Sequence, residues 1–176
     1  MPDFQRDDAI SALLDRQAIW DCLLRYARGV DRLDEALIRS AYWPDAHDSH
    51  GQLNGSLDQF LAGWLPRQPQ RDVAHHLLGN HLVELNGDAA DAETYFISAA
   101  KTAGSGVLEL VGGRYVDHFE KRSGEWRILT RLVLLDWQGT ADASGMAERL
   151  ALSHRGTRGP ADPSYERPVQ PRLQVS

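Results

Sequence analysis

Apolar positions in the first third of the chain recur every three or four residues, which is the period of a helix with one buried face. The clearest run extends from Asp8 to about Val30, and Gly29 near its end suits a helix stop. A short second helix follows with Asp34 as its cap, and a third begins at Ser56, where Gln59 completes a capping box. The apolar stripe of the first helix comprises Ile10, Leu13, Leu14, Ile19, Leu23, Ala27 and Val30. The pattern therefore predicts three helices in this part of the chain.

Beyond residue 72 the pattern changes to long runs typical of strands, separated by glycine-containing turns such as Asn86-Gly87-Asp88. A shorter strand, His47 to Gln52, precedes the Asn54-Gly55 turn. The four long predicted strands are Val73–Leu85, Asp91–Lys101, Val107–Glu120 and Trp126–Trp137. Helices followed by an antiparallel meander predict an α+β fold in which the helices cover one face of the sheet.

The composition changes after Gly139. One short helix is expected within Ala141–Ser153, and Arg155–Ser176 is rich in Pro, Gly and Arg, as in an extended tail. That tail either stays disordered or wraps a neighbouring subunit. We therefore expect a domain over residues 1–140, followed by a C-terminal helix and tail over residues 141–176.

Length, composition and charge exclude several classes of protein. A chain of 176 residues with 42% hydrophobic residues fits one globular domain. A formal net charge of -6 argues against a nucleic-acid groove. The single cysteine, Cys22, excludes an internal disulfide and a thiolate-rich zinc site. Neither a signal-peptide pattern nor an apolar run of bilayer length is present, so we expect a cytoplasmic protein without a membrane partner.

The strand Val73–Leu85 carries polar residues where its pattern indicates a buried face. Strand alternation places His76 and Asn80 together among aliphatic residues, and places His75 and His81 on the opposite face. A histidine in such a position is either a hydrogen-bonded core residue or a catalytic base. The strand is therefore the first candidate for a functional site.

Other polar residues have two interpretations each. Asp31, after the first helix, is a turn residue or the partner of a base, and Tyr26 is a packing residue or a hydrogen-bond donor. Arg131 in the last strand is a surface residue, or it points inward towards an anion. Asp48 and His50 point the same way from the early strand. Their spacing to the other histidines matches no standard ligand set, so we expect no metal site.

The order of these segments resembles the SnoaL-like branch of the nuclear transport factor 2-like superfamily. The resemblance extends from about Asp15 to Trp137 and is carried by the segments YWPDAHDSHG, AHHLLGNHLVEL and GGRYVDHFEKRSGEWRIL. It implies a cone-shaped barrel in which N-terminal helices pack on a curved antiparallel sheet. Within that branch the sequence is similar to cofactor-free β-elimination enzymes, namely bile-acid 7α-dehydratases, lindane dehydrochlorinase and, more distantly, scytalone dehydratase.

The resemblance implies a catalytic set at Tyr26, Asp31, His76 and Arg131, and a lyase that needs neither cofactor nor metal. In such enzymes the aspartate orients the histidine, which removes a proton from carbon. The expected substrate-binding residues are Trp43, Asp48, His50, Phe60, Trp64, Leu78 and Asn80. Asp48 and His50 depart from the apolar lining of the dehydrochlorinase, which implies a hydrophobic cyclic or aromatic substrate that carries polar groups.

Three functions remain open at this point. The first is dehydratase-type elimination in the breakdown of aromatic compounds. The second is other carbon-acid chemistry: isomerisation, polyketide-type cyclisation, or aldehyde-releasing cleavage of a lignin-derived diaryl compound. The third is ligand binding without catalysis. We also expect a homo-oligomer, a trimer in preference to a dimer, because Thr94–Phe96 and Tyr115–Phe119 are expected to expose aromatic residues on the outer sheet face.

Overall fold

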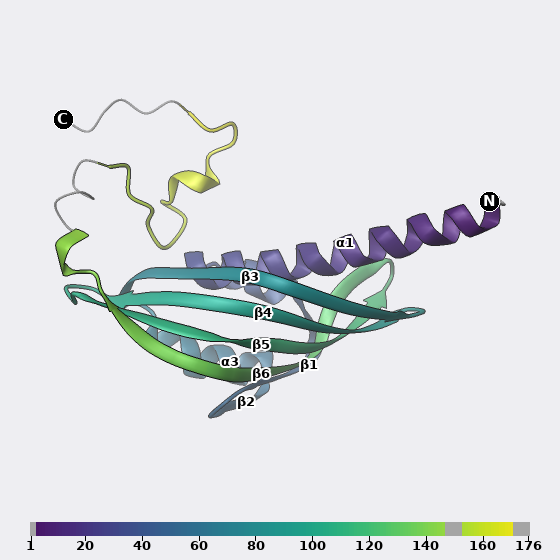
Figure 1. The fold of residues 1–176 in the computed structure, drawn as a ribbon, viewed down its shortest axis with the longest axis horizontal. Coiled ribbons are helices and arrows are strands. Elements are labelled where there is room, and N and C mark those ends of the chain that lie inside the picture. Colours follow the sequence, from purple (N-terminus) through teal and green to yellow (C-terminus); the bar gives the residue numbers. More distant parts are fainter. Residues whose placement is uncertain (1–2, 147–152, 171–176) are drawn as a thin grey trace.

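One curved, open sheet forms the body of the protein in a computed structural model that describes residues 3–146 and 153–170 (Figure 1). Its strands are β1 (Tyr42–His50), β2 (Leu53–Ser56), β3 (Arg71–Asn86), β4 (Ala89–Thr102), β5 (Val107–Arg122) and β6 (Glu125–Asp142). They lie in the order β2-β1-β6-β5-β4-β3. Neighbouring strands are antiparallel except for β1 and β6, which run parallel, so the sheet is mixed where an antiparallel one was expected.

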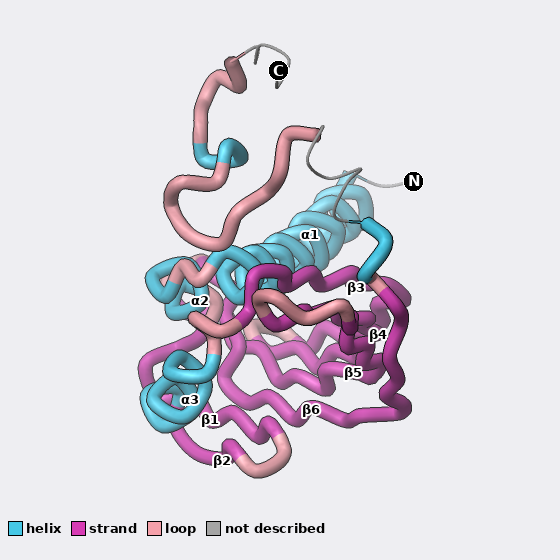
Figure 2. The backbone as a smooth tube through the Cα atoms, turned by 90° about the vertical axis from the view of Figure 1, so that its left-hand side faces the viewer, coloured by secondary structure: helices cyan, strands magenta, loops and turns pink. Residues whose placement is uncertain are grey.

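Three helices cover the concave face of the sheet, as the α+β cone requires (Figure 2). They are α1 (Asp3–Arg32), α2 (Glu35–Ser40) and α3 (Leu57–Trp64). Both predicted caps are confirmed: the Asp34 side chain accepts a hydrogen bond from the Leu37 N–H, and Ser56 and Gln59 form a capping box. Among the described helices, none combines the length and apolar character needed to cross a bilayer.

The end of α1 differs from the prediction in a way that positions the site. The helix continues past Gly29 and ends at Arg32, followed by Leu33 at a φ of 54°. A Cβ on Gly29 would lie 2.7 Å from Cγ1 of Ile38, so this glycine permits α2 to cross closely over α1. The predicted role of Gly29 as a helix stop is therefore wrong. As a result, Asp31 lies in the last turn of α1 instead of beyond it.

The apolar stripe of α1 is buried only along part of its length. Ile19, Leu23 and Val30 are buried, whereas Leu13 and Leu14 are 66% and 64% exposed. The N-terminal turns project beyond the sheet, as Figure 1 shows. The sequence pattern cannot show this difference, because the helical period is the same in both halves.

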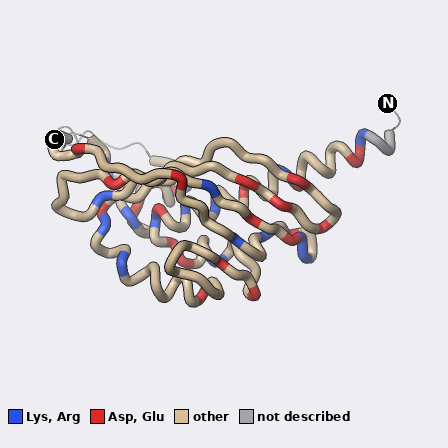
Figure 3. Tube along the Cα trace, turned by 60° about the horizontal axis from the view of Figure 1, so that its bottom comes forward, with Lys and Arg blue, Asp and Glu red and all other residues tan. Residues whose placement is uncertain are grey.

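The two faces of the sheet are assigned differently from the prediction. Phe96, Tyr115 and Phe119 point towards the helices and are at most 6% exposed, and Thr94 is fully buried. The expectation of outward aromatic residues is therefore wrong for Phe96, Tyr115 and Phe119, whereas Tyr95 is 43% exposed on the outer face. The outer face also carries Ile97, Val116, Leu132 and Trp137, all more than one third exposed. Acidic and basic residues are interspersed over the molecule (Figure 3), and Arg114 pairs with both Glu93 and Asp136.

The C-terminal part also departs from the sequence pattern. Strand β6 continues to Asp142, and a 3-10 turn follows at Ser144–Met146. The predicted helix over Ala141–Ser153 therefore begins within a strand, and its remainder lies partly outside the described residues. Residues 153–170 return to the end of α1, where Tyr165 bonds to Asp34. This segment includes a further 3-10 turn, Pro163–Tyr165.

Candidate functional site

Asp31 and His76 lie 45 residues apart in the sequence and form a two-point contact. Asp31 Oδ1 lies 2.7 Å from Nδ1 of His76, and Oδ2 accepts the backbone N–H of His76 at 3.0 Å. A carboxylate only accepts hydrogen bonds, so the proton of the neutral imidazole is assigned to Nδ1 and the lone pair to Nε2. Their side chains are 14% and 15% exposed. The pair is thus oriented like a base and its partner, and it stays within reach of a small molecule.

Packing of α1 along β3 brings these two residues together. Arg16 donates to the Val83 carbonyl oxygen at 2.5 Å, and the rings of Trp20 and His81 lie 4.9 Å apart. His76 pairs with Ser98 on β4, and its ring lies 6.4 Å from that of Phe96. The histidine is therefore held between the last turn of α1 and the aromatic inner face of the sheet.

A bulge in β3 reverses the predicted faces beyond Leu78. Leu78 pairs with Phe96, and the next registered pair is His81 with Thr94, so one extra residue is accommodated in β3. His81 therefore points inward, where Nδ1 lies 2.8 Å from Thr94 Oγ1, and Asn80 is exposed. The expected placement of Asn80 beside His76 is wrong, as is that of His81 on the outer face. Gly79, an isolated glycine in a strand, was a sequence signal for this bulge.

Arg131 is fully buried in a cage made of one carboxylate and several aromatic rings. Its Nε and Nη2 donate to the two oxygens of Asp117, both at 2.7 Å. The rings of Tyr26 and Tyr115 lie 4.2 and 4.1 Å from the guanidinium carbon, and that of Tyr42 lies 5.6 Å away. Among the described residues, Nη1 has no hydrogen-bond partner. One donor of an otherwise anchored cation is therefore unused.

Burial sets the protonation of this cage. Burial raises the pKa of Tyr26 well above its usual value, so its hydroxyl remains a neutral donor. Burial also raises the pKa of Asp117, and the charge and hydrogen bonds of Arg131 counter that rise. Sequence reasoning missed Asp117, although it alternates with Tyr115 and Phe119 on the inward side of β5. The inward arginine thus has the carboxylate partner that burial demands.

A second histidine–carboxylate pair lies at the other side of the concave face. His50 Nδ1 is 3.1 Å from Asp48 Oδ1, and the Tyr42 hydroxyl donates to Oδ2 at 2.6 Å. Asp48 is fully buried, whereas the His50 side chain is 29% exposed and stacks on Phe60, which in turn stacks on Trp64. Burial alone would raise the pKa of Asp48, but the hydrogen bond and charge of His50 bring it below its usual value.

The sheet register joins this second pair to the arginine cage. Arg131 on β6 is in register with Asp48 on β1 and with Asp117 on β5, so three buried charges lie in one row. His76 faces the same concave side from β3. Strands β6, β5 and β4 lie between β3 and β1, which carries Asp48 and His50. Two partly exposed imidazoles, each with an oriented carboxylate, thus flank one buried guanidinium.

Trp43 does not belong to this site, contrary to the prediction. Its indole Nε1 donates to the Glu120 carbonyl oxygen at 3.0 Å, and the guanidinium carbons of Arg122 and Arg127 lie 4.9 and 4.8 Å from its ring centre. Because Tyr42 points inward, strand alternation directs its neighbour outward. Leu78 does pack against the core from the inner side.

The described residues bring together no group of three His, Cys, Asp or Glu side chains in an arrangement suited to a metal ion. The thiol of Cys22 is buried and donates to the Ala41 carbonyl oxygen at 3.2 Å. Burial raises the pKa of this thiol to about 11, which suits a packing residue better than a nucleophile.

Known proteins share this architecture. A candidate scytalone dehydratase of Novosphingobium aromaticivorans is 14% identical with a TM-score of 0.69, covering 87% of this chain and 97% of its own. A hexachlorocyclohexane dehydrochlorinase of Novosphingobium barchaimii is 18% identical with a TM-score of 0.67, covering 76% and 94%. An uncharacterized protein of Mycobacterium tuberculosis is 27% identical over 131 residues, covering 70% of this chain and 87% of the relative. The SnoaL-like domain profile matches residues 11–132, more than half of the chain, and this protein belongs to that family of the nuclear transport factor 2-like superfamily.

Proposed function

We propose that this protein is a cofactor-independent lyase that removes water by β-elimination from a hydrophobic cyclic or aromatic small molecule. The observation that carries the proposal is the two-point contact of Asp31 with the ring and backbone of His76. It fixes the tautomer with a free lone pair on Nε2, in a partly exposed position. Proteins of the same fold include a dehydrochlorinase and a candidate dehydratase, whose names describe eliminations.

In the proposed reaction, Nε2 of His76 takes a proton from a carbon next to a carbonyl or aromatic ring. The electron pair of that C–H bond forms the new double bond as the β C–O bond breaks. Asp31 stabilises the imidazolium that results. The departing hydroxyl takes up a proton and leaves as water, and the excess proton on His76 is returned to solvent.

His50 is proposed as the donor to the leaving hydroxyl, with Asp48 as its orienting partner. Loss of a hydroxyl group is assisted by a proton, and a second histidine–carboxylate pair at the opposite side of the concave face can supply it and regain a proton from solvent. This observation favours elimination over an isomerisation that needs only one base. The other carbon-acid reactions remain the alternative.

Arg131 and Tyr26 are proposed to act on the substrate oxygen that gains negative charge. The unused Nη1 of Arg131 belongs to a guanidinium already fixed by Asp117, so it would donate with little reorganisation. Tyr26 supplies a neutral hydroxyl beside it. Phe60, Trp64 and Leu78 are proposed as apolar walls that exclude water.

The test is a panel of cyclic and aryl β-hydroxy carbonyl compounds incubated with the protein and with His76→Gln. A rise in absorbance from a conjugated product, absent in His76→Gln, is the expected result. Deuterium exchange at carbon in heavy water with the hydroxyl retained would instead indicate isomerase-type chemistry. Binding without either reaction across the panel would leave a ligand-binding protein.

We further propose that the protein is a cytoplasmic homotrimer that acts in the breakdown of aromatic compounds. The apolar residues of the outer sheet face, which include Leu132 at 45% and Trp137 at 47% exposure, support an oligomer. Light scattering at micromolar concentration tests the state, and a monomer would contradict it.

A further inference from the structure

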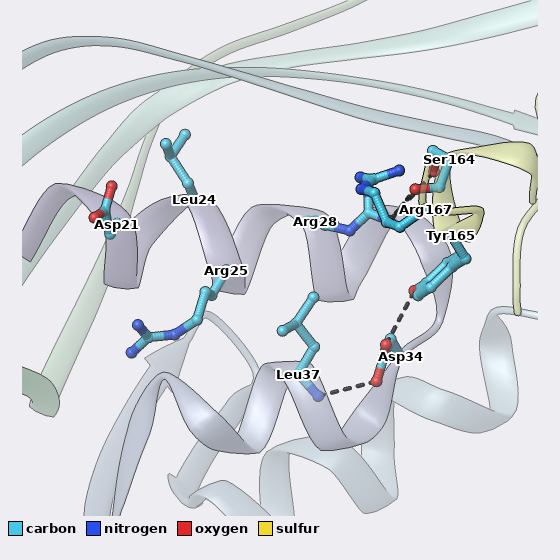
Figure 4. A pocket seen from close by; sticks show the side chains of 9 residues that line it. All are labelled: Asp21, Leu24, Arg25, Arg28, Asp34, Leu37, Ser164, Tyr165 and Arg167. Carbon is cyan, nitrogen blue, oxygen red and sulfur yellow. Dashed lines mark hydrogen bonds between the residues drawn. The ribbon is translucent and has the colours of Figure 1, made fainter. Parts of the chain in front are cut away.

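Residues 153–170, which follow β6 in the chain, form a segment that lies over the end of α1 (Figure 1). Figure 4 shows part of its contact with the helices, where the Tyr165 hydroxyl donates a hydrogen bond to Asp34 and Arg28 donates one to Ser164. A groove of about 510 Å³ lies between this segment and the outward sides of α1 and α2. The groove does not contain Asp31 or His76, so it is separate from the proposed site.

The segment is internally organised around Asp162, which is 4% exposed. Its carboxylate accepts the backbone N–H groups of Thr157 and Ser164 at 2.7 and 2.9 Å, and Arg32 of α1 lies 3.5 Å away. Burial would raise the pKa of Asp162, but the hydrogen bonds from Ser164 and Thr157 lower it to about 2. A turn held in this way presents the intervening residues, among them Arg158, in a fixed direction.

Arg158 binds the last carbonyl groups of α1 directly. Its Nη2 donates to the Val30 oxygen at 2.9 Å, and its Nε donates to the Asp31 oxygen at 3.1 Å. The final carbonyls of a helix lack partners within the helix and favour a cation. The guanidinium therefore holds the backbone of the residue whose carboxylate orients His76.

The same guanidinium also holds the connection that leads into β3. Its Nη1 lies 3.3 Å from the backbone oxygen of Gln68 and 3.4 Å from its Oε1. Gln68 is 6% exposed, and its backbone oxygen also accepts the N–H of Arg71, the first residue of β3. One side chain thus links the element that carries Asp31 to the start of the strand that carries His76.

We propose that Arg158 is a positioning residue for the Asp31–His76 pair, a role that rests on the proposed function of that pair. It fixes the Asp31 backbone so that both carboxylate oxygens keep their contacts with His76. Its planar fork reaches three backbone oxygens together, which the single ammonium of a lysine cannot reproduce. The C-terminal segment is therefore a working part of the site, although it contributes no group that touches the substrate.

The experiment uses the full chain with ¹⁵N-labelled histidine and the variants Arg158→Met and Arg158→Lys. The matched control is Arg28→Met, which removes a contact of the same segment with α1 at Ser164 and a ring contact with Tyr165. The measured signal is the downfield Nδ1–H resonance of His76, assigned by its loss in His76→Gln. With a substrate from the panel, kcat and KM are measured in parallel.

In Arg158→Met the His76 resonance is expected to move upfield and exchange faster with water, and kcat is expected to fall about 10- to 10²-fold with KM little changed. Arg28→Met should leave both unchanged. If Arg158→Met does not fold, Arg158→Lys is compared with Arg28→Met instead, and its His76 resonance is expected to show a smaller upfield shift. A folded Arg158 variant with an unaltered His76 resonance overturns the positioning role. If the His76 resonance shifts in Arg158→Met but His76→Gln keeps full turnover, the positioning role of Arg158 stands and the proposal that His76 is the base is overturned.

Discussion

Two of the carboxylate–cation pairs on the concave face, Asp31–His76 and Asp117–Arg131, differ in exposure. In the Asp31–His76 pair both side chains are about one seventh exposed, whereas Arg131 and Asp117 are fully buried and joined by two hydrogen bonds. The first pair can exchange a proton with a bound molecule. The second cannot separate without leaving a charge in a medium that solvates it poorly. This difference is the basis for the proposal that the exposed pair reacts and the buried pair holds the inner face in place.

The two pairs also differ in which atoms their hydrogen bonds leave free. Asp31 uses both oxygens on one residue and leaves Nε2 of His76 available, while Asp117 uses both oxygens on a guanidinium already enclosed by tyrosine rings. An arginine held by two hydrogen bonds to a buried carboxylate stays in one position, so any support that it gives to a substrate comes from a fixed charge. This comparison assigns proton transfer to the histidine and fixed electrostatic support to the arginine.

The largest expected effect is on turnover when the exposed pair is altered. His76→Gln removes the proposed base, and Asp31→Asn removes the group that stabilises its charged form, so each should lower kcat by about 10²–10⁴. Steady-state kinetics on a panel substrate, with circular dichroism to check folding, measures this. His75→Gln is the control because His75 is exposed on the outer face. A loss of kcat in His75→Gln as large as that in His76→Gln would contradict the assignment of catalysis to the concave face of the sheet.

The buried pair should affect stability instead. Asp117→Asn leaves Arg131 without its counter-charge and should lower the free energy of unfolding by about 3–5 kcal/mol. Urea denaturation of the wild type, Asp117→Asn, Arg131→Met and the double variant Asp117→Asn/Arg131→Met measures the effect. The double variant should lose less than the sum of the single ones, because no unpaired charge remains. Additive losses would contradict a coupled pair.

The second histidine pair offers an intermediate case. His50→Gln should lower kcat by about 10², towards the low end for an acid–base group, for substrates with a poor leaving group. A substrate whose leaving group needs no proton should be turned over at close to the wild-type rate. The comparison of the two substrates is the measurement. Equal losses with both would assign His50 to binding and not to proton donation.

The smallest expected effect is that of His81 on the pH dependence of stability. The ring of this inward histidine forms a hydrogen bond with a threonine instead of a carboxylate. Burial, followed by the charge of Arg16, lowers its pKa below the ordinary 6.5. Its contribution to stability is therefore full above pH 6.5 and declines as the pH falls towards the folded-state pKa. His81→Leu should lose less stability than the wild type between pH 7 and pH 5 in thermal unfolding. Identical slopes would show that His81 protonates freely in the folded state.

Local features were read from the sequence because they depend on neighbouring residues. The caps at Asp34 and Ser56 are hydrogen bonds within one helical turn, and the strand runs follow from their turns and apolar content. The pairing of Asp31 with His76 was expected from the order of segments shared with the family. Strand alternation gave the shared direction of Asp48 and His50, and the structure shows that this direction is inward for Asp48.

Tertiary structure decided the features that depend on what lies opposite a residue. The prediction from strand alternation fails at Asn80 and His81 because β3 has one more residue than β4 at a bulge after Leu78. The alternating pattern of apolar and polar residues does not show where such an extra residue lies. The partner of Arg131 depends on the register between β5 and β6. The contacts of Arg158 join segments more than 100 residues apart in the sequence. The sequence by itself determined which elements form and where the candidate base lies, because those depend on short-range hydrogen bonds and apolar periodicity. Only the folded chain determined which charges are buried, which are paired and which can meet a substrate, because burial and pairing depend on segments that fold against each other.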